Sequence, residues 1–123
     1  MQVSKNFNSI TDHMQCPCCN AFDYKTAFID RVQILRDLMQ VPFYLDKKGG
    51  GFYRCRDYNA SIGGAKSSQH LLGNAMDVSS LGWDGHKKWE FISEATKLKL
   101  SVGIYNNFFH IDYRSIPVMW LGR

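Results

Sequence analysis

Two short stretches, far apart in the chain, restrict what this sequence can fold into more than any other feature. Residues 68–77 read SQHLLGNAMD, and residues 110–112, near the end, read HID. Two of the four histidines lie in these stretches, each followed at a short distance by a carboxylate. Two neutral imidazoles and one carboxylate suit a zinc ion that keeps its fourth position for water. The fold is therefore expected to bring His70, Asp77 and His110 to one point.

The residues around both stretches indicate β-strands. Residues 74–79 predict a short strand in which Asp77 shares a face with Ala75, whose small side chain leaves room for an ion. Residues 100–105 and 108–113 predict a hairpin that turns at Asn106-Asn107. In the second hairpin strand, alternation places His110 and Asp112 on the same face. Both polar side chains can therefore address one site.

Apolar periodicity predicts two helices, over residues 24–39 and about 85–98. Asp23 and Asp84 are their expected N-caps. The expected apolar contacts are Phe28, Val32, Leu35 and Met39 in the first helix, and Trp89, Ile92 and Leu98 in the second. Residues 59–67 indicate a loop that leads into the first histidine stretch. The expected fold class is α+β, with helices packed on a small, mostly antiparallel sheet.

Composition places the chain among globular proteins and excludes several functions. Its 123 residues, 45% hydrophobic and 21% charged, predict one domain over residues 1–123. A net charge of +4 favours anionic partners such as cell-wall polymers, but no dense basic run with interleaved aromatics predicts nucleic-acid binding. Residues 1–8 lack the apolar core of a secretory signal, and no apolar stretch approaches the roughly 20 residues that span a bilayer. We therefore expect synthesis in the cytoplasm and no membrane partner.

The pattern Ser-x-His-x-x-Gly-x-Ala-x-Asp at residues 68–77 resembles the zinc-ligand motif of the D-alanyl-D-alanine carboxypeptidase and endopeptidase superfamily. These enzymes cut peptidoglycan and share a metal core with the hedgehog signalling domain. Residues 53–66 resemble the family segment that precedes the histidine motif, and residues 103–112 resemble its closing hairpin. The opening of the chain, with Phe7 and a cysteine cluster, is similar to small phage-encoded, endolysin-like members.

The resemblance implies a zinc peptidase that hydrolyses amide bonds in peptidoglycan stem peptides. His70, Asp77 and His110 would be the zinc ligands. Arg54 would grip a substrate carboxylate, a task that suits a planar guanidinium; the alternative for Arg54 is a surface salt bridge. A phage product of this kind would reach the bacterial cell wall after release from the cell or as part of a virion tail. The alternative function is a non-catalytic structural or binding module of a virion that keeps the peptidase fold.

The chain departs from the family pattern in two places. Gly51-Phe52 replaces the usual Ser-Gly before the Tyr-Arg pair, and Asn107 occupies the position where many members have an acidic general base. Asp112 is the best remaining catalytic carboxylate. It would either take a proton from water or orient a ligand histidine, and the sequence leaves both roles open.

Four cysteines remain outside this assignment. Cys16, Cys18 and Cys19 cluster near the N-terminus, and Cys55 follows Arg54. Reduced thiols that are buried and tie the N-terminal segment to the core are the first expectation for a protein made in the cytosol. The alternatives are a disulfide from Cys55 to the cluster and a small structural zinc site that the cluster forms with His13 and Cys55.

Overall fold

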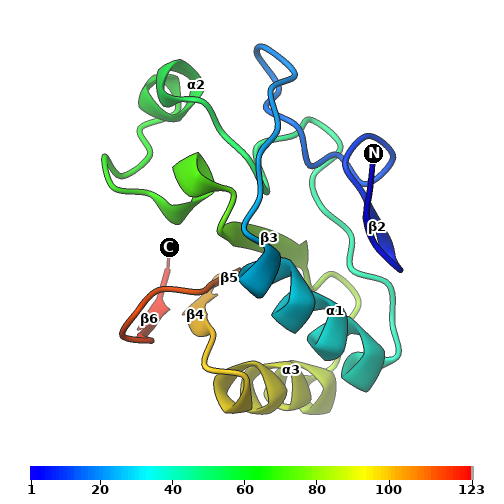
Figure 1. Cartoon of the computed structure of the whole chain (residues 1–123). Coiled ribbons are helices and arrows are strands. Elements are labelled where there is room, and N and C mark those ends of the chain that lie inside the picture. The colour runs from blue at the N-terminus through cyan, green and yellow to red at the C-terminus, as the bar shows by residue number, and fades with distance from the viewer. Residues whose placement is uncertain (123) are drawn as a thin grey trace.

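A four-stranded sheet forms the centre of the computed structural model, which describes residues 1–122 (Figure 1). In spatial order its strands are β3 (Ala75–Ser79), β5 (Phe108–Asp112), β4 (Ser101–Ile104) and β6 (Met119–Leu121). The pairs β3–β5 and β4–β5 are antiparallel, whereas β4 and β6 run parallel. The predicted hairpin of β4 and β5 is confirmed, and the expected α+β class holds.

The pairing of β3 with β5 brings the two histidine stretches together. Asp77 lies opposite His110, and Ala75 lies opposite Asp112. Because side chains alternate along a strand, a register shift of one residue would turn His110 and Asp112 to the other face of the sheet. The core face of the same strands carries buried Val78, so burial of that face fixes the register.

Helices α1 (Thr26–Met39) and α3 (Gly85–Lys97) lie side by side and cover the apolar face of the sheet (Figure 1). The predicted stripe of α1 is buried as expected, with Ile29 added to it. The apolar positions expected of α3 are partly wrong. Trp89 is 64% exposed, whereas Phe91 and Ala95, one turn apart, are the buried residues of this helix. Phe91 stacks on Phe109 of the sheet, and this contact sets which face of α3 is turned inward.

The two helix caps differ in outcome. The carboxylate of Asp84 accepts the backbone N–H of Lys87 at 2.8 Å, which confirms the predicted cap of α3. The predicted cap at Asp23 is wrong, because α1 begins two residues later and Lys25 is its N-cap. The backbone N–H of Lys25 donates to the carbonyl of Gly73 at 3.0 Å, which holds the chain extended up to this point.

The loop expected over residues 59–67 is partly helical. Helix α2 (Arg56–Ser61) occupies its beginning and is capped by Cys55, whose sulfur accepts the N–H of Tyr58. A short 3-10 helix, η1 (Gln69–Leu72), follows and carries His70. A second small sheet pairs β1 (Gln2–Ser4) with β2 (Phe7–Asn8). Among residues 1–122 no helix is long and apolar enough to cross a bilayer.

Candidate metal centre

His70, Asp77 and His110 meet at one point, as the sequence predicts. They come from η1, β3 and β5, and one donor atom from each lies within 4.8 Å of the other two. The Oδ1 atom of Asp77 lies 3.3 Å from Nε2 of His70 and 3.0 Å from Nδ1 of His110. The three residues that the motif singled out therefore form one compact donor cluster.

Backbone contacts fix the orientation of His70. Its ring is buried, and Nδ1 lies 2.7 Å from the carbonyl oxygen of Phe52. A carbonyl can only accept, so Nδ1 carries the proton and Nε2 faces Asp77. Ser68 accepts the N–H of His70 where η1 begins, and Gly73 ends η1 with a φ of 64°. A Cβ atom at Gly73 would lie 2.1 Å from the carbonyl oxygen of Asp23, so only glycine fits this turn.

Asp112 fixes the orientation of His110. Its side chain is fully buried, and Oδ2 accepts a hydrogen bond from Nε2 of His110 at 2.7 Å. Arg114 donates to both oxygens of the same carboxylate, at 2.9 and 2.5 Å. Burial raises the pKa of Asp112, but the hydrogen bonds from Arg114 and His110 outweigh it and lower the pKa to about 2. The Asp112 carboxylate therefore stays ionised and leaves Nδ1 of His110 turned toward Asp77.

The donor set fits a metal cation. In the neutral rings, Nδ1 of His70 donates its proton to a hydrogen bond with the Phe52 carbonyl, and Nε2 of His110 donates to Asp112. The other nitrogen of each ring therefore presents a lone pair to the Asp77 carboxylate. Burial raises the pKa of Asp77, but the two adjacent imidazoles lower it well below the usual range, so the carboxylate is ionised. Three acceptors that face one another need positive charge between them, and two imidazoles with one carboxylate match an open zinc site.

A pocket of about 520 Å³ opens beside this cluster. Its wall includes Asp77 and Arg54, together with Tyr58 and Asn107. The volume is in the range of roughly 300–1,000 Å³ that is typical of small-ligand sites. Asp77 thus belongs both to the donor cluster and to the pocket, which gives a bound molecule access to the cluster.

Hydrogen bonds hold Arg54 in the pocket wall, so its side chain is not part of a mobile surface salt bridge. Its Nε atom donates to the carbonyl of Gly50 at 2.7 Å, and Nη1 donates to Oδ1 of buried Asn59 at 3.3 Å. Its Nη2 atom lies 3.5 Å from Oδ2 of Asp77, a long contact for an ion pair. The orientation of the guanidinium is therefore fixed, while its Nη2 atom, near the donor cluster, makes only this weak contact.

A sequence model of the family described as peptidase M15 matches residues 16–112, a span that includes both histidine stretches. The chain belongs to the peptidase M15 family. M15 peptidases use zinc, so membership agrees with the donor set and suggests a metallopeptidase. No curated protein matches the chain.

One residue of the pocket wall, Asn107, bears on proton transfer in this M15 chain. Asn107 is exposed and lies in the pocket wall, where an amide side chain cannot accept a proton at neutral pH. Within residues 1–122, the carboxylates of the pocket wall are Asp77 and Asp46. The carboxylate of Asp46 accepts the N–H of Lys48 within its own turn. The pocket therefore has no acid at the position where many family members have one.

Sequence reasoning missed three groups that support the site: the carbonyl of Phe52, the amide of Asn59 and the guanidinium of Arg114. Arg114 follows Asp112 by two residues, so strand alternation was a usable signal for it. Asn59 gave no such signal, because its place is set by packing against Gly64, where a Cβ atom would lie 2.1 Å from Asn59 Oδ1.

The expectation of buried thiols is wrong for two of the four cysteines. Cys16 is buried, but Cys18 and Cys19 are exposed and Cys55 is half-buried. All four are free, and their sulfurs form a second cluster of potential metal ligands. His13, which the sequence offered as a further ligand, does not belong to this cluster.

Proposed function

We propose that this M15 chain is a zinc peptidase that hydrolyses amide bonds in peptidoglycan stem peptides. The observation that carries the proposal is the convergence of His70 Nε2, Asp77 Oδ1 and His110 Nδ1 beside a pocket. These three atoms would hold the ion. When bound in such a site, zinc lowers the pKa of a water molecule and polarises an amide carbonyl.

Arg54 supports a substrate with a free carboxylate, as peptidoglycan stem peptides have. Arg54 faces Asp77 through one long contact. A cation shared with Asp77 would take up that negative charge, so the outer edge of the guanidinium becomes free to pair with another carboxylate. A planar guanidinium binds a carboxylate through two parallel hydrogen bonds, which also fixes the direction of the peptide in the pocket.

Of the two roles open to Asp112, we propose that it orients His110. Both oxygens of Asp112 are engaged by His110 and Arg114, and its side chain is fully buried. A group with a pKa of about 2 is also a weak proton acceptor near neutral pH. Asp112 would then act through the position of the His110 ring and have no direct contact with substrate.

Asn107 favours one alternative, a non-catalytic module that keeps the peptidase fold. Its amide stands at the position of the family acid and cannot exchange protons with substrate at neutral pH. Such a module would bind the same stem peptides through Arg54 and leave them intact. The resemblance of the N-terminal segment to small phage-encoded members supports either role at the bacterial cell wall, as a released enzyme or as a virion component.

Digestion of purified peptidoglycan separates the two functions. We expect the zinc-loaded protein to release fragments whose masses identify a cut amide bond, and we expect chelation to abolish this release. His110→Ala should also abolish this release. His86→Ala, a change at an exposed histidine outside the pocket, is its matched control and should retain it. If fully zinc-loaded protein binds peptidoglycan from several bacteria and cleaves none of it, the non-catalytic function is correct.

A further inference from the structure

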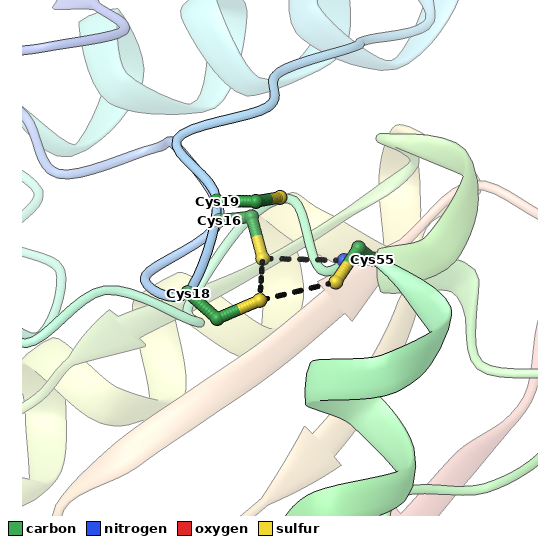
Figure 2. Close-up of side chains that lie close together, drawn as sticks. All are labelled: Cys16, Cys18, Cys19 and Cys55. Carbon is green, nitrogen blue, oxygen red and sulfur yellow. Dashed lines mark hydrogen bonds between the residues drawn. The ribbon is translucent and has the colours of Figure 1, made fainter.

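Four cysteines from two distant segments meet at the surface of the molecule (Figure 2). Cys16, Cys18 and Cys19 lie in the N-terminal loop, and Cys55 lies directly before α2. Their sulfur atoms all lie within 4.8 Å of one another. Every cysteine of the chain is in this cluster, and none of them lies in the donor cluster of His70.

The spacing of the sulfurs matches one ion better than it matches paired disulfides. Cys18 Sγ lies 3.6 Å from Cys16 Sγ and 3.3 Å from Cys55 Sγ. In a tetrahedral zinc site with bonds of about 2.3 Å, neighbouring sulfurs lie about 3.8 Å apart. A disulfide bond would join only two sulfurs, at about 2.05 Å, whereas one ion engages all four near these spacings.

Backbone donors already point at two of the sulfurs. The N–H of Cys55 donates to Cys16 Sγ, and the N–H of Tyr58 donates to Cys55 Sγ, both at 3.4 Å (Figure 2 shows the first). Such N–H groups stabilise the negative charge of metal-bound thiolates and orient them. Cys18 and Cys19 are exposed, so an ion can enter from solvent.

We propose that Cys16, Cys18, Cys19 and Cys55 bind a structural zinc ion, separate from the ion of the proposed active site. Binding releases the four thiol protons to solvent and closes all four coordination positions with sulfur, as in structural sites generally. The ion joins the loop of residues 16–19 to the start of α2. Arg54 is the residue next to Cys55, and its N–H donates to the carbonyl of His70 at 3.1 Å, so the ion also steadies the pocket wall.

Cobalt substitution of the reduced, metal-free protein tests this site without changing any cysteine. Thiolate ligands give Co²⁺ an intense charge-transfer band in the near ultraviolet, whereas a site of two histidines and an aspartate gives none. We expect the band to saturate at one Co²⁺ per chain and to disappear when one equivalent of Zn²⁺ is added. We expect it to persist in His110→Ala, so the result is independent of the proposed active site.

Cys18→Ser, a change at an exposed side chain, should weaken zinc binding at this site at least tenfold. His13→Ala is the matched control, because His13 lies near the loop in sequence and outside the cluster; it should bind zinc as the unaltered chain does. Absence of the charge-transfer band in fully reduced wild-type protein would overturn the proposal. So would a Cys18–Cys55 disulfide that forms in its place and persists in the presence of excess zinc and mild thiol reductant.

Discussion

Each polar side chain of the candidate active site is held by a partner that limits what it can do. His70 is fixed by the carbonyl of Phe52, and His110 is fixed by Asp112. Asp112 is fixed in turn by two hydrogen bonds from Arg114. The chain of contacts leaves the two free imidazole nitrogens turned toward Asp77. The geometry of the donor atoms is therefore set in advance, which would reduce the entropy lost if they bind an ion.

We expect Asp112→Asn to lower zinc affinity by about 10- to 100-fold, because an amide orients the His110 ring less strongly than a carboxylate does. Competition with a chromophoric chelator measures the affinity, and peptide hydrolysis measures turnover. If Asp112 only orients His110, activity returns at saturating zinc. A loss of roughly 100-fold or more in kcat at full zinc occupancy would instead make Asp112 the general base.

Arg54→Lys should impair the enzyme almost as much as Arg54→Ala. A lysine ammonium is a point charge and cannot form two parallel hydrogen bonds with a substrate carboxylate. We expect kcat/KM to fall by at least tenfold while both variants remain folded. Arg56→Lys, at an exposed position two residues later, is the matched control and should be neutral. Wild-type kinetics in Arg54→Ala would remove Arg54 from the substrate site.

At the scale of elements, local sequence patterns predicted which polar side chains share one face of the central sheet. The alternation of β3 and β5 and the hairpin turn placed Asp77, His110 and Asp112 correctly, because period and facing are local properties. The parallel strand β6 was missed, since its three residues pair with β4 only through tertiary contacts. The inward face of α3 was misjudged for the same reason. Trp89 is a large apolar residue and was expected to face the core, yet Phe91 is the residue that packs on Phe109.

The turn after η1 is the element whose geometry depends most on one residue. Gly73→Ala places a Cβ against the backbone of Asp23 at a positive φ, so we expect it to destabilise the fold by roughly 2–4 kcal/mol. Gly82→Ala is the matched control, because its φ is also positive but nothing lies within 4 Å of its Cβ; about 1–2 kcal/mol is expected there. Urea unfolding measures both. Equal losses would mean that the close approach to Asp23 contributes nothing.

At the scale of the whole molecule, the functional groups lie on four segments that the fold brings together. The pair β3–β5 supplies Asp77 and His110, η1 supplies His70, and the segment before α2 supplies Arg54 and Cys55. The hydrogen bond from Arg54 N–H to the His70 carbonyl links the last two segments. The sequence motif singled out the candidate ligands, and the position of Cys55 next to Arg54 was visible in the sequence. The hydrogen bond from Arg54 to His70, which links the cysteine cluster to the pocket, is a tertiary contact that only the fold shows.

Zinc content is the measurement that tests the central claim, a metal centre at His70, Asp77 and His110, most directly. After equilibration with excess zinc and removal of free ion, His110→Ala and His70→Ala should each contain one zinc per chain fewer than His86→Ala, because two remaining ligands rarely hold zinc tightly. Both variants should also lose peptide hydrolysis, whereas His86→Ala should retain it. Equal zinc content in all three variants would contradict the assignment of the metal centre.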